Sequence, residues 1–202
     1  MSVMHNILLH TFGRPQGILG RVGGIIMART NQKCAAWVVD LLEIKPNDSV
    51  LEVGYGPGVG IELLTKVVSE GEVAGVDYSE EMVKQATARN MKAIENGRVK
   101  LRHGSVECLP FADYTFDEAL AINSMQVWLD SAAGLLEMGR VLKTGGRIAI
   151  GFTPYSGQSK TGLSEVFMAA AFADVKVVES ELGFCALGRK ENHDALAIEN
   201  SP

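Results

Sequence analysis

Apolar residues recur along this chain in two alternating rhythms: short runs of strand length, and longer stretches with helical spacing. The first strand-like run is Val50-Leu-Glu-Val. Ile61, Leu64 and Val68 follow it at the three- and four-residue steps of a helix. The same order repeats through five strand–helix units, which predicts a mainly parallel sheet covered on both faces.

The pattern also predicts how the chain enters and leaves this alternation. From Asn31 a helix is expected, with Cys34, Trp37, Val38 and Leu41 on one face. Pro46-Asn-Asp is then typical of a turn into the first strand. Strand-like runs around Val175 and Phe184 lie too close together for a crossover helix, so we expect them to pair as a hairpin whose second strand is antiparallel.

One helix has predicted limits at both ends. Asp130 is expected to cap its start, and the helix is expected to carry Leu135, Met138 and Leu142. Gly145 suits its stop, because glycine readily adopts the left-handed conformation found after many helices.

A glycine-rich loop joins the first strand to its helix. Glu52 lies in the strand, and Gly54, Gly56 and Gly58 follow at alternating positions. Glycine allows a sharp turn and the close approach of a ligand, at the place where open α/β sheets hold nucleotide-like molecules. The sixth position counted from Gly54 is Val59, so the dinucleotide fingerprint is not met, and no Gly-Lys-Ser/Thr phosphate loop follows.

The second predicted strand, Glu72-Val-Ala-Gly-Val-Asp77, ends in an acid. Asp77 lies nineteen positions after Gly58, close to the spacing at which such folds place a carboxylate against ribose hydroxyls. A carboxylate can accept two charge-assisted hydrogen bonds there. The alternative is a strand-end acid favoured by the dipole of the next helix.

Three further runs complete a family pattern: His103–Phe111, Phe116–Asp130 and Gly139–Ile150. With the glycine loop and Asp77, they resemble the class I S-adenosylmethionine (SAM)-dependent methyltransferases, in particular the methyltransferase type 11 group that includes the ubiquinone/menaquinone-type enzymes. The resemblance covers residues 31–190. It implies an α/β, Rossmann-like three-layer sandwich with a seven-stranded, mostly parallel sheet of order 3-2-1-4-5-7-6 and an antiparallel last strand.

The resemblance implies SAM as cofactor and S-adenosylhomocysteine as its product. The implied cofactor-binding residues are Glu52, Gly54, Tyr55, Gly56, Gly58, Asp77, Tyr78, Met82, Ser105, Val106 and Asn123. Glu52 corresponds to the family's carboxylate near the methionine end. Ser105 stands where the family usually has an Asp at the adenine, and a hydroxyl can accept from the amino group only without charge. Packing for Tyr55 and a turn role for Asn123 remain alternatives.

The resemblance further implies transfer of a methyl group, by in-line displacement, to a small-molecule acceptor that is partly apolar or anionic. An NAD(P)-dependent Rossmann oxidoreductase and a non-catalytic SAM-binding regulatory module are the alternatives. No catalytic residue is predicted: His5, His10 and His103 are candidates only by their ordinary pKa. Residues 1–30 are expected to form a lid or substrate cap over a domain at 31–190, and 191–202 a polar tail.

Charge and cysteine content limit the classes of partner and the cellular compartment that the sequence allows. The net charge is −5, and the first 39 residues hold four basic residues and no acid, which leaves 15 basic and 24 acidic residues for the remainder. This balance argues against a nucleic-acid partner, whereas the basic start could contact an anionic substrate or a membrane surface.

No apolar run is long enough for a transmembrane segment. Three scattered cysteines, interpreted as buried apolar residues, predict no metal site and a cytoplasmic protein. The oligomeric state stays open.

Overall fold

A single seven-stranded sheet organises the part of the chain that the computed structural model describes, residues 32–191. The predicted N-terminal lid and all but the first residue of the predicted tail lie outside these residues. The strands are β1 (Ser49–Val53), β2 (Glu72–Asp77), β3 (Val99–His103), β4 (Phe116–Ile122), β5 (Leu142–Phe152), β6 (Phe172–Ser180) and β7 (Gly183–Lys190). Their order is β3-β2-β1-β4-β5-β7-β6, with β7 antiparallel to β5 and β6. The predicted sheet is thereby confirmed.

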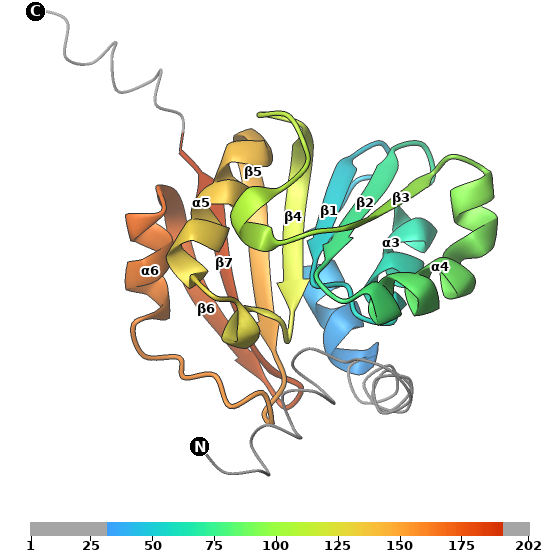
Figure 1. Ribbon diagram of the computed structural model, residues 1–202. Helices are drawn as coiled ribbons and strands as arrows, with labels where there is room; N and C mark the ends of the chain where they lie inside the picture. Colours follow the sequence, from blue (N-terminus) through green and yellow to red (C-terminus); the bar gives the residue numbers. More distant parts are fainter. Residues whose placement is uncertain (1–31, 192–202) are drawn as a thin grey trace, which may run out of the picture.

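Helices cover both faces of the sheet, as Figure 1 shows. A helix over residues 32–41 precedes β1, and the later elements are α3 (Val59–Val67), α4 (Glu80–Glu95), α5 (Ser131–Val141), α6 (Leu163–Ala169) and the short 3-10 turns η2 (Val106–Cys108) and η3 (Met125–Val127). Because successive strand residues point to opposite faces, Leu51 and Ile150 pack with α5 and α6, whereas Val50 and Ala149 pack with the helix over 32–41 and α3.

The start of α5 agrees with the sequence pattern and its end does not. Asp130 caps the helix by accepting hydrogen bonds from the backbone N–H groups of Ala132 and Ala133, at 2.9 and 3.0 Å. The helix ends at Val141, however, and Leu142 is already the first residue of β5, paired with Phe116. The prediction that Leu142 belongs to the helix is therefore wrong. Its fully buried side chain is part of the sheet, and the spacing of apolar residues along the chain does not reveal this pairing.

The cysteines divide between core and surface. Cys34 and Cys185 are buried, as expected, and burial raises the pKa of both thiols. Cys108 is exposed at the end of η2, so its interpretation as a buried residue is wrong. Among the described residues no cluster of His, Cys, Asp and Glu has the arrangement of a metal site.

Within residues 32–191, no helix has both the length and the apolar character needed to span a membrane.

The strand order creates the place for a ligand. From β1 the chain proceeds outward to β2 and β3, then returns to β4 on the other side of β1. Loops leaving the carboxyl ends of β1 and β4 therefore diverge to opposite faces and leave a crevice between them, the usual ligand position in open α/β sheets.

Candidate active site

The glycine loop after β1 adopts a conformation that only glycine readily takes. Gly54, Gly56 and Gly58 have φ angles of 69°, 52° and 81°, in the left-handed region. Gly54 also has no room for a side chain, because a Cβ there would lie 2.4 Å from Cβ of Ser124, on the loop after β4. Its N–H donates to the carbonyl oxygen of Val76 at 2.8 Å, which ties the loop to β2.

Asp77 holds this loop in place from the end of β2. One carboxylate oxygen accepts a hydrogen bond from the N–H of Gly56 and the other accepts one from the N–H of Ser79, both at 2.8 Å. The side chain is buried, and burial raises its pKa, while the two backbone N–H groups and nearby His103 act in the opposite direction. Each carboxylate oxygen has a second lone pair, so Asp77 can also accept hydrogen bonds from ribose hydroxyls.

Glu52 is a buried acid with an unsatisfied oxygen. The residue is 3 % exposed, and its Oε2 has no hydrogen-bond partner among the described residues. Burial, reinforced by the charge of Asp77, raises the pKa of Glu52 to about 8, although a hydrogen bond from the backbone of Ile61 lowers it. A buried carboxyl group without a partner is costly unless a ligand completes it. An ammonium group would do so.

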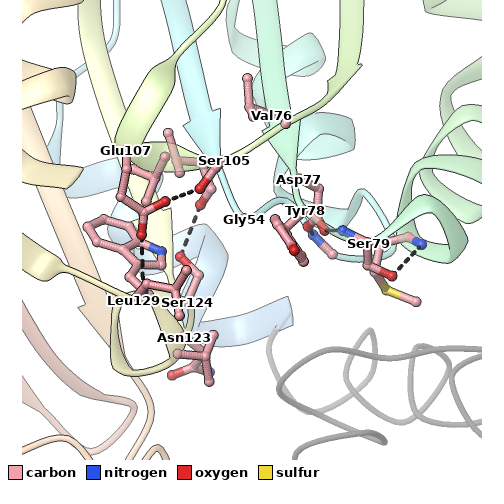
Figure 2. A pocket seen from close by; sticks show the side chains of 17 residues that line it. Gly54, Val76, Asp77, Tyr78, Ser79, Ser105, Glu107, Asn123, Ser124 and Leu129 are labelled. Atoms are coloured by element: carbon pink, nitrogen blue, oxygen red, sulfur yellow. Dashed lines mark hydrogen bonds between the residues drawn. The ribbon is translucent and has the colours of Figure 1, made fainter. Parts of the chain in front are cut away.

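Two hollows meet at the glycine loop. The first, here called the main cavity, is open to solvent and has a volume of about 740 Å³ between the ends of β1, β2 and β4. Met82, Val106 and Trp128 supply its apolar lining. Figure 2 shows Asp77 and Ser79 on one side of it and Ser105, Glu107 and Leu129 on the other. The second hollow, of about 390 Å³, lies on the other side of the loop and is lined by Glu52, Pro57, Gly60 and Ala35 among others.

The structure brings most of the predicted cofactor residues to these hollows. Eight of them line the main cavity: Gly54, Gly56, Asp77, Tyr78, Met82, Ser105, Val106 and Asn123. Glu52 and Tyr55 line only the second hollow, which shares Gly54, Gly56 and Asn123 with the first. Gly58 lines neither: it starts α3 and lies against α4, where a Cβ would come 2.8 Å from Cβ of Ala86.

Tyr55 has the position of a core residue. It is 3 % exposed, its ring lies against Gly75, where a Cβ would approach the ring to 2.5 Å, and its hydroxyl donates to the carbonyl oxygen of Arg102 at 3.3 Å. Burial raises the pKa of its hydroxyl further above its usual range. Most of the Tyr55 side chain therefore packs in the core, as the alternative interpretation expected.

Asn123 joins the ends of β4 and β5. Its backbone is left-handed, with φ of 49°, which asparagine tolerates better than most residues. Its side-chain oxygen accepts hydrogen bonds from the N–H and hydroxyl of Thr153, at 2.8 and 3.2 Å. Asn123 therefore serves as a turn residue and also lines both hollows.

Several site residues were absent from the predicted set. Gly60 lies directly against the carboxyl group of Glu52, and Gly104 and Glu107 line the main cavity. Trp128 lines it too, next to Gly134 of α5, where a Cβ would lie 2.8 Å from the indole ring. A fourth consecutive alternating glycine, Gly60, was a visible signal. The contacts of Glu107 depend on tertiary packing, and no local pattern indicates them.

Charge distinguishes the ligands that this crevice can take. The described residues that line the two hollows include three carboxylates, Glu52, Asp77 and Glu107, and no Lys, Arg or His. The phosphates of a dinucleotide would meet acidic side chains and no cationic one in this lining, which disfavours the oxidoreductase alternative. A ligand that carries an ammonium and a sulfonium is favoured instead.

Comparisons with known proteins agree with this geometry. A family model described as a methyltransferase domain matches residues 51–150. The uncharacterized methyltransferase YdaC of Bacillus subtilis is 31% identical over 181 residues, which cover 84% of this chain and 98% of that protein. The ubiquinone/menaquinone biosynthesis C-methyltransferase UbiE of Geotalea daltonii is 33% identical over 115 residues, 56% of this chain and 49% of that relative. The crystal structure of a SAM-dependent methyltransferase from Aquifex aeolicus shares the fold, with a TM-score of 0.67 at 24% identity over 79% of this chain and 91% of that one.

The chain belongs to the SAM-dependent methyltransferases of type 11. Its residues fit the cofactor of that family: Glu52 has an unpartnered buried oxygen that could take the ammonium of the methionine part, and the lone pairs of Asp77 could accept from the ribose hydroxyls. When bound, SAM supplies an electrophilic methyl group on sulfur. The chain's own contribution is to bind, orient and shield that group from water.

Proposed function

We propose that this methyltransferase acts on a small, partly apolar acceptor that binds over the carboxyl ends of β4 and β5. The proposal is supported by one arrangement: Glu52 and Asn123 line the same hollow, so a methionine part held at Glu52 would extend toward Asn123, whose side chain accepts a hydrogen bond from Thr153 just after β5. The segment after Thr153 presents Tyr155, whose side chain is 96% exposed. An exposed aromatic ring in the segment that follows β5 suits an acceptor with an apolar part.

The relatives support the same class of acceptor. UbiE of Geotalea daltonii is by name a C-methyltransferase of quinone biosynthesis, and this chain spans about half of its length. An aromatic acceptor with an apolar substituent is therefore the first to test. A cytoplasmic location belongs to this proposal and is supported by three cysteines that are all free thiols.

The described lining of the hollows contains no histidine or lysine that could act as a general base. His103 lies outside the cavity lining, with Nε2 2.8 Å from the carbonyl oxygen of Tyr78, in a structural position. The other two candidates, His5 and His10, lie outside the described residues. Transfer would then depend on alignment, which can contribute roughly 7–11 kcal/mol when reacting atoms are held at attack distance.

The test combines binding with turnover. Calorimetric titration with SAM, S-adenosylhomocysteine and NADH should show binding of the two sulfur ligands only, with loss in Asp77→Ala. Because Asp77 also holds Gly56 and Ser79, Glu52→Gln is the gentler companion variant.

Turnover is then measured as S-adenosylhomocysteine formed with a panel of phenolic and quinol acceptors that differ in their apolar substituent. Tyr155→Ala should raise KM for the apolar acceptors by about tenfold and leave cofactor affinity unchanged. Tyr114→Ala, at an exposed tyrosine on the loop before β4, is the control. Cofactor binding without turnover of any acceptor would favour the non-catalytic module, and an unchanged KM in Tyr155→Ala would refute the placement of the acceptor.

A further inference from the structure

Two consecutive residues of α4 hold the glycine loop, although neither belongs to the described lining of the two hollows. Nε of Arg89 donates a hydrogen bond to the carbonyl oxygen of Pro57 at 2.9 Å, and Nδ2 of Asn90 donates to that of Gly58 at 3.1 Å. α3 and α4 lie side by side on one face of the sheet, as Figure 1 shows, which brings the middle of α4 against the start of α3. We call Arg89 and Asn90, with these two bonds, the α4 clamp.

Asn90 is an unusual residue for the middle of a helix. It is 5% exposed, and its φ and ψ angles, −105° and 16°, depart from helical geometry. Asparagine is unfavourable inside helices because its amide competes for backbone hydrogen bonds, and here Nδ2 also donates to the carbonyl oxygen of Ala86 at 3.0 Å. The fit to the loop is close: a Cβ on Gly58 would lie 2.6 Å from Nδ2. The contact with the loop, and not helix propensity, therefore explains the residue at this position.

The segment that the α4 clamp holds forms part of the wall of the second hollow. Pro57 and Val59 line this hollow and do not line the main cavity. Asp77 fixes the loop one residue earlier, through the N–H of Gly56. Glycine has more backbone freedom than any other residue, so a loop with three glycines needs such attachments to keep one shape before a ligand binds.

We propose that the α4 clamp positions the glycine loop for the amino-acid part of the cofactor. A loop that is already held in its binding shape loses less conformational entropy when the ligand arrives, which increases affinity. Because the held segment borders the second hollow, next to Glu52, the gain falls on the part of the ligand that enters this hollow. Arg89 and Asn90 are positioning residues and do not contact the ligand. This inference rests on the SAM cofactor and not on the acceptor proposed above.

Calorimetry with two ligands separates this role from a general loss of stability. S-adenosylhomocysteine has an amino-acid part, whereas 5′-methylthioadenosine has the same nucleoside without it. Asn90→Ala should weaken binding of S-adenosylhomocysteine by about tenfold and binding of methylthioadenosine by less than about threefold. The fold should persist, because the carbonyl oxygen of Gly58 still accepts from the N–H of Glu62 at 3.1 Å and alanine favours the helix. Equal weakening of both ligands, or no weakening of either, would overturn the proposal.

Arg89→Ala provides a second variant that does not disturb the core, since this side chain is 37% exposed. It should show the same selective loss, by about three- to tenfold. Arg98→Ala is its matched control: Arg98 donates to the carbonyl oxygen of Thr65 at 3.3 Å, near the other end of α3, and its loss should leave the ratio of the two affinities unchanged. Asn96→Ala, at the exposed C-cap of α4, is the corresponding control for Asn90→Ala. A control that lowers the ratio as much as the clamp variants would refute a specific role of the clamp.

Hydrogen exchange of the ligand-free protein gives a readout that needs no ligand. In Asn90→Ala the amides of residues 54–60 should exchange faster, by about tenfold, whereas those of β4 and β5 should keep their wild-type rates. Unchanged exchange in the loop would contradict a shape held by the clamp. Failure of every methyl acceptor would leave these results unaffected, whereas absence of S-adenosylhomocysteine binding to the wild type would overturn the cofactor assignment and this inference with it.

Discussion

The carboxyl group of Glu52 occupies the space that a side chain at position 60 would fill: a Cβ on Gly60 would lie 2.2 Å from Oε1 of Glu52. The glycine that ends the loop pattern is thus the neighbour that lets a buried acid stand beside the second hollow. The acid and the glycine act as one unit.

Gly60→Ala should weaken S-adenosylhomocysteine binding by about ten- to a hundredfold, because the added methyl group displaces the carboxyl group from its position. Gly60 lies in the first turn of α3, and its φ is not positive, so the backbone tolerates alanine. Calorimetry of Gly60→Ala, Glu52→Gln and the double variant provides the measurement. Their effects should be strongly non-additive, and simple additivity would contradict the shared role.

Cofactor binding should release a proton from Glu52. With a pKa of about 8 in the free protein, this carboxyl group is mostly protonated at pH 7, and a bound ammonium favours the ionised form. Affinity for S-adenosylhomocysteine should therefore increase as pH rises from 6 to 7, by close to tenfold per pH unit.

Titration at pH 7 in two buffers of different ionisation enthalpy measures the proton directly. Glu52→Gln should release about one proton fewer than the wild type. Asp77 and Glu118 also have pKa values raised by burial, and the comparison with this variant removes their contribution. Equal proton release in both proteins would contradict the assignment.

Gly54→Ala should disrupt both binding and stability. Gly54 and Gly97 have similar φ angles, 69° and 75°, but a Cβ at Gly97 meets nothing within 4 Å, whereas one at Gly54 meets Ser124. Gly97→Ala should cost roughly 1–2 kcal/mol of folding free energy, from backbone strain alone. Urea unfolding should show a larger loss for Gly54→Ala, and S-adenosylhomocysteine binding should be lost only there. Matching losses in both variants would argue against the steric contact.

Gly134→Ala should perturb the main cavity through Trp128. The added methyl group would come 2.8 Å from the indole ring, so the ring must move, although alanine favours the helix by about 1 kcal/mol. We expect weaker S-adenosylhomocysteine binding, by about tenfold, and an altered tryptophan fluorescence spectrum. Gly139→Ala, in the same helix with its nearest neighbour at 3.5 Å, is the matched control and should change neither.

Much of the fold and of the ligand crevice could be read from local patterns. The alternating strand and helix periods, the hairpin and the cap at Asp130 are set by neighbouring residues, and all are confirmed. The end of α5 was not, because Leu142 has the spacing of a helix residue but pairs with Phe116, a strand residue twenty-six positions earlier. Local periodicity contains no information on such a partner.

The sequence by itself determined the class of protein, the strand order that its family implies, and the positions of Glu52, Asp77 and the glycine loop, because these lie in short continuous motifs. Only the tertiary structure decided that Glu52 is left with an unpartnered oxygen, that Tyr55 lies in the core, and that Glu107 accepts hydrogen bonds from both Ser105 and Leu129. The reason is physical: burial, pKa and hydrogen-bond direction depend on the groups that folding brings together from distant parts of the chain.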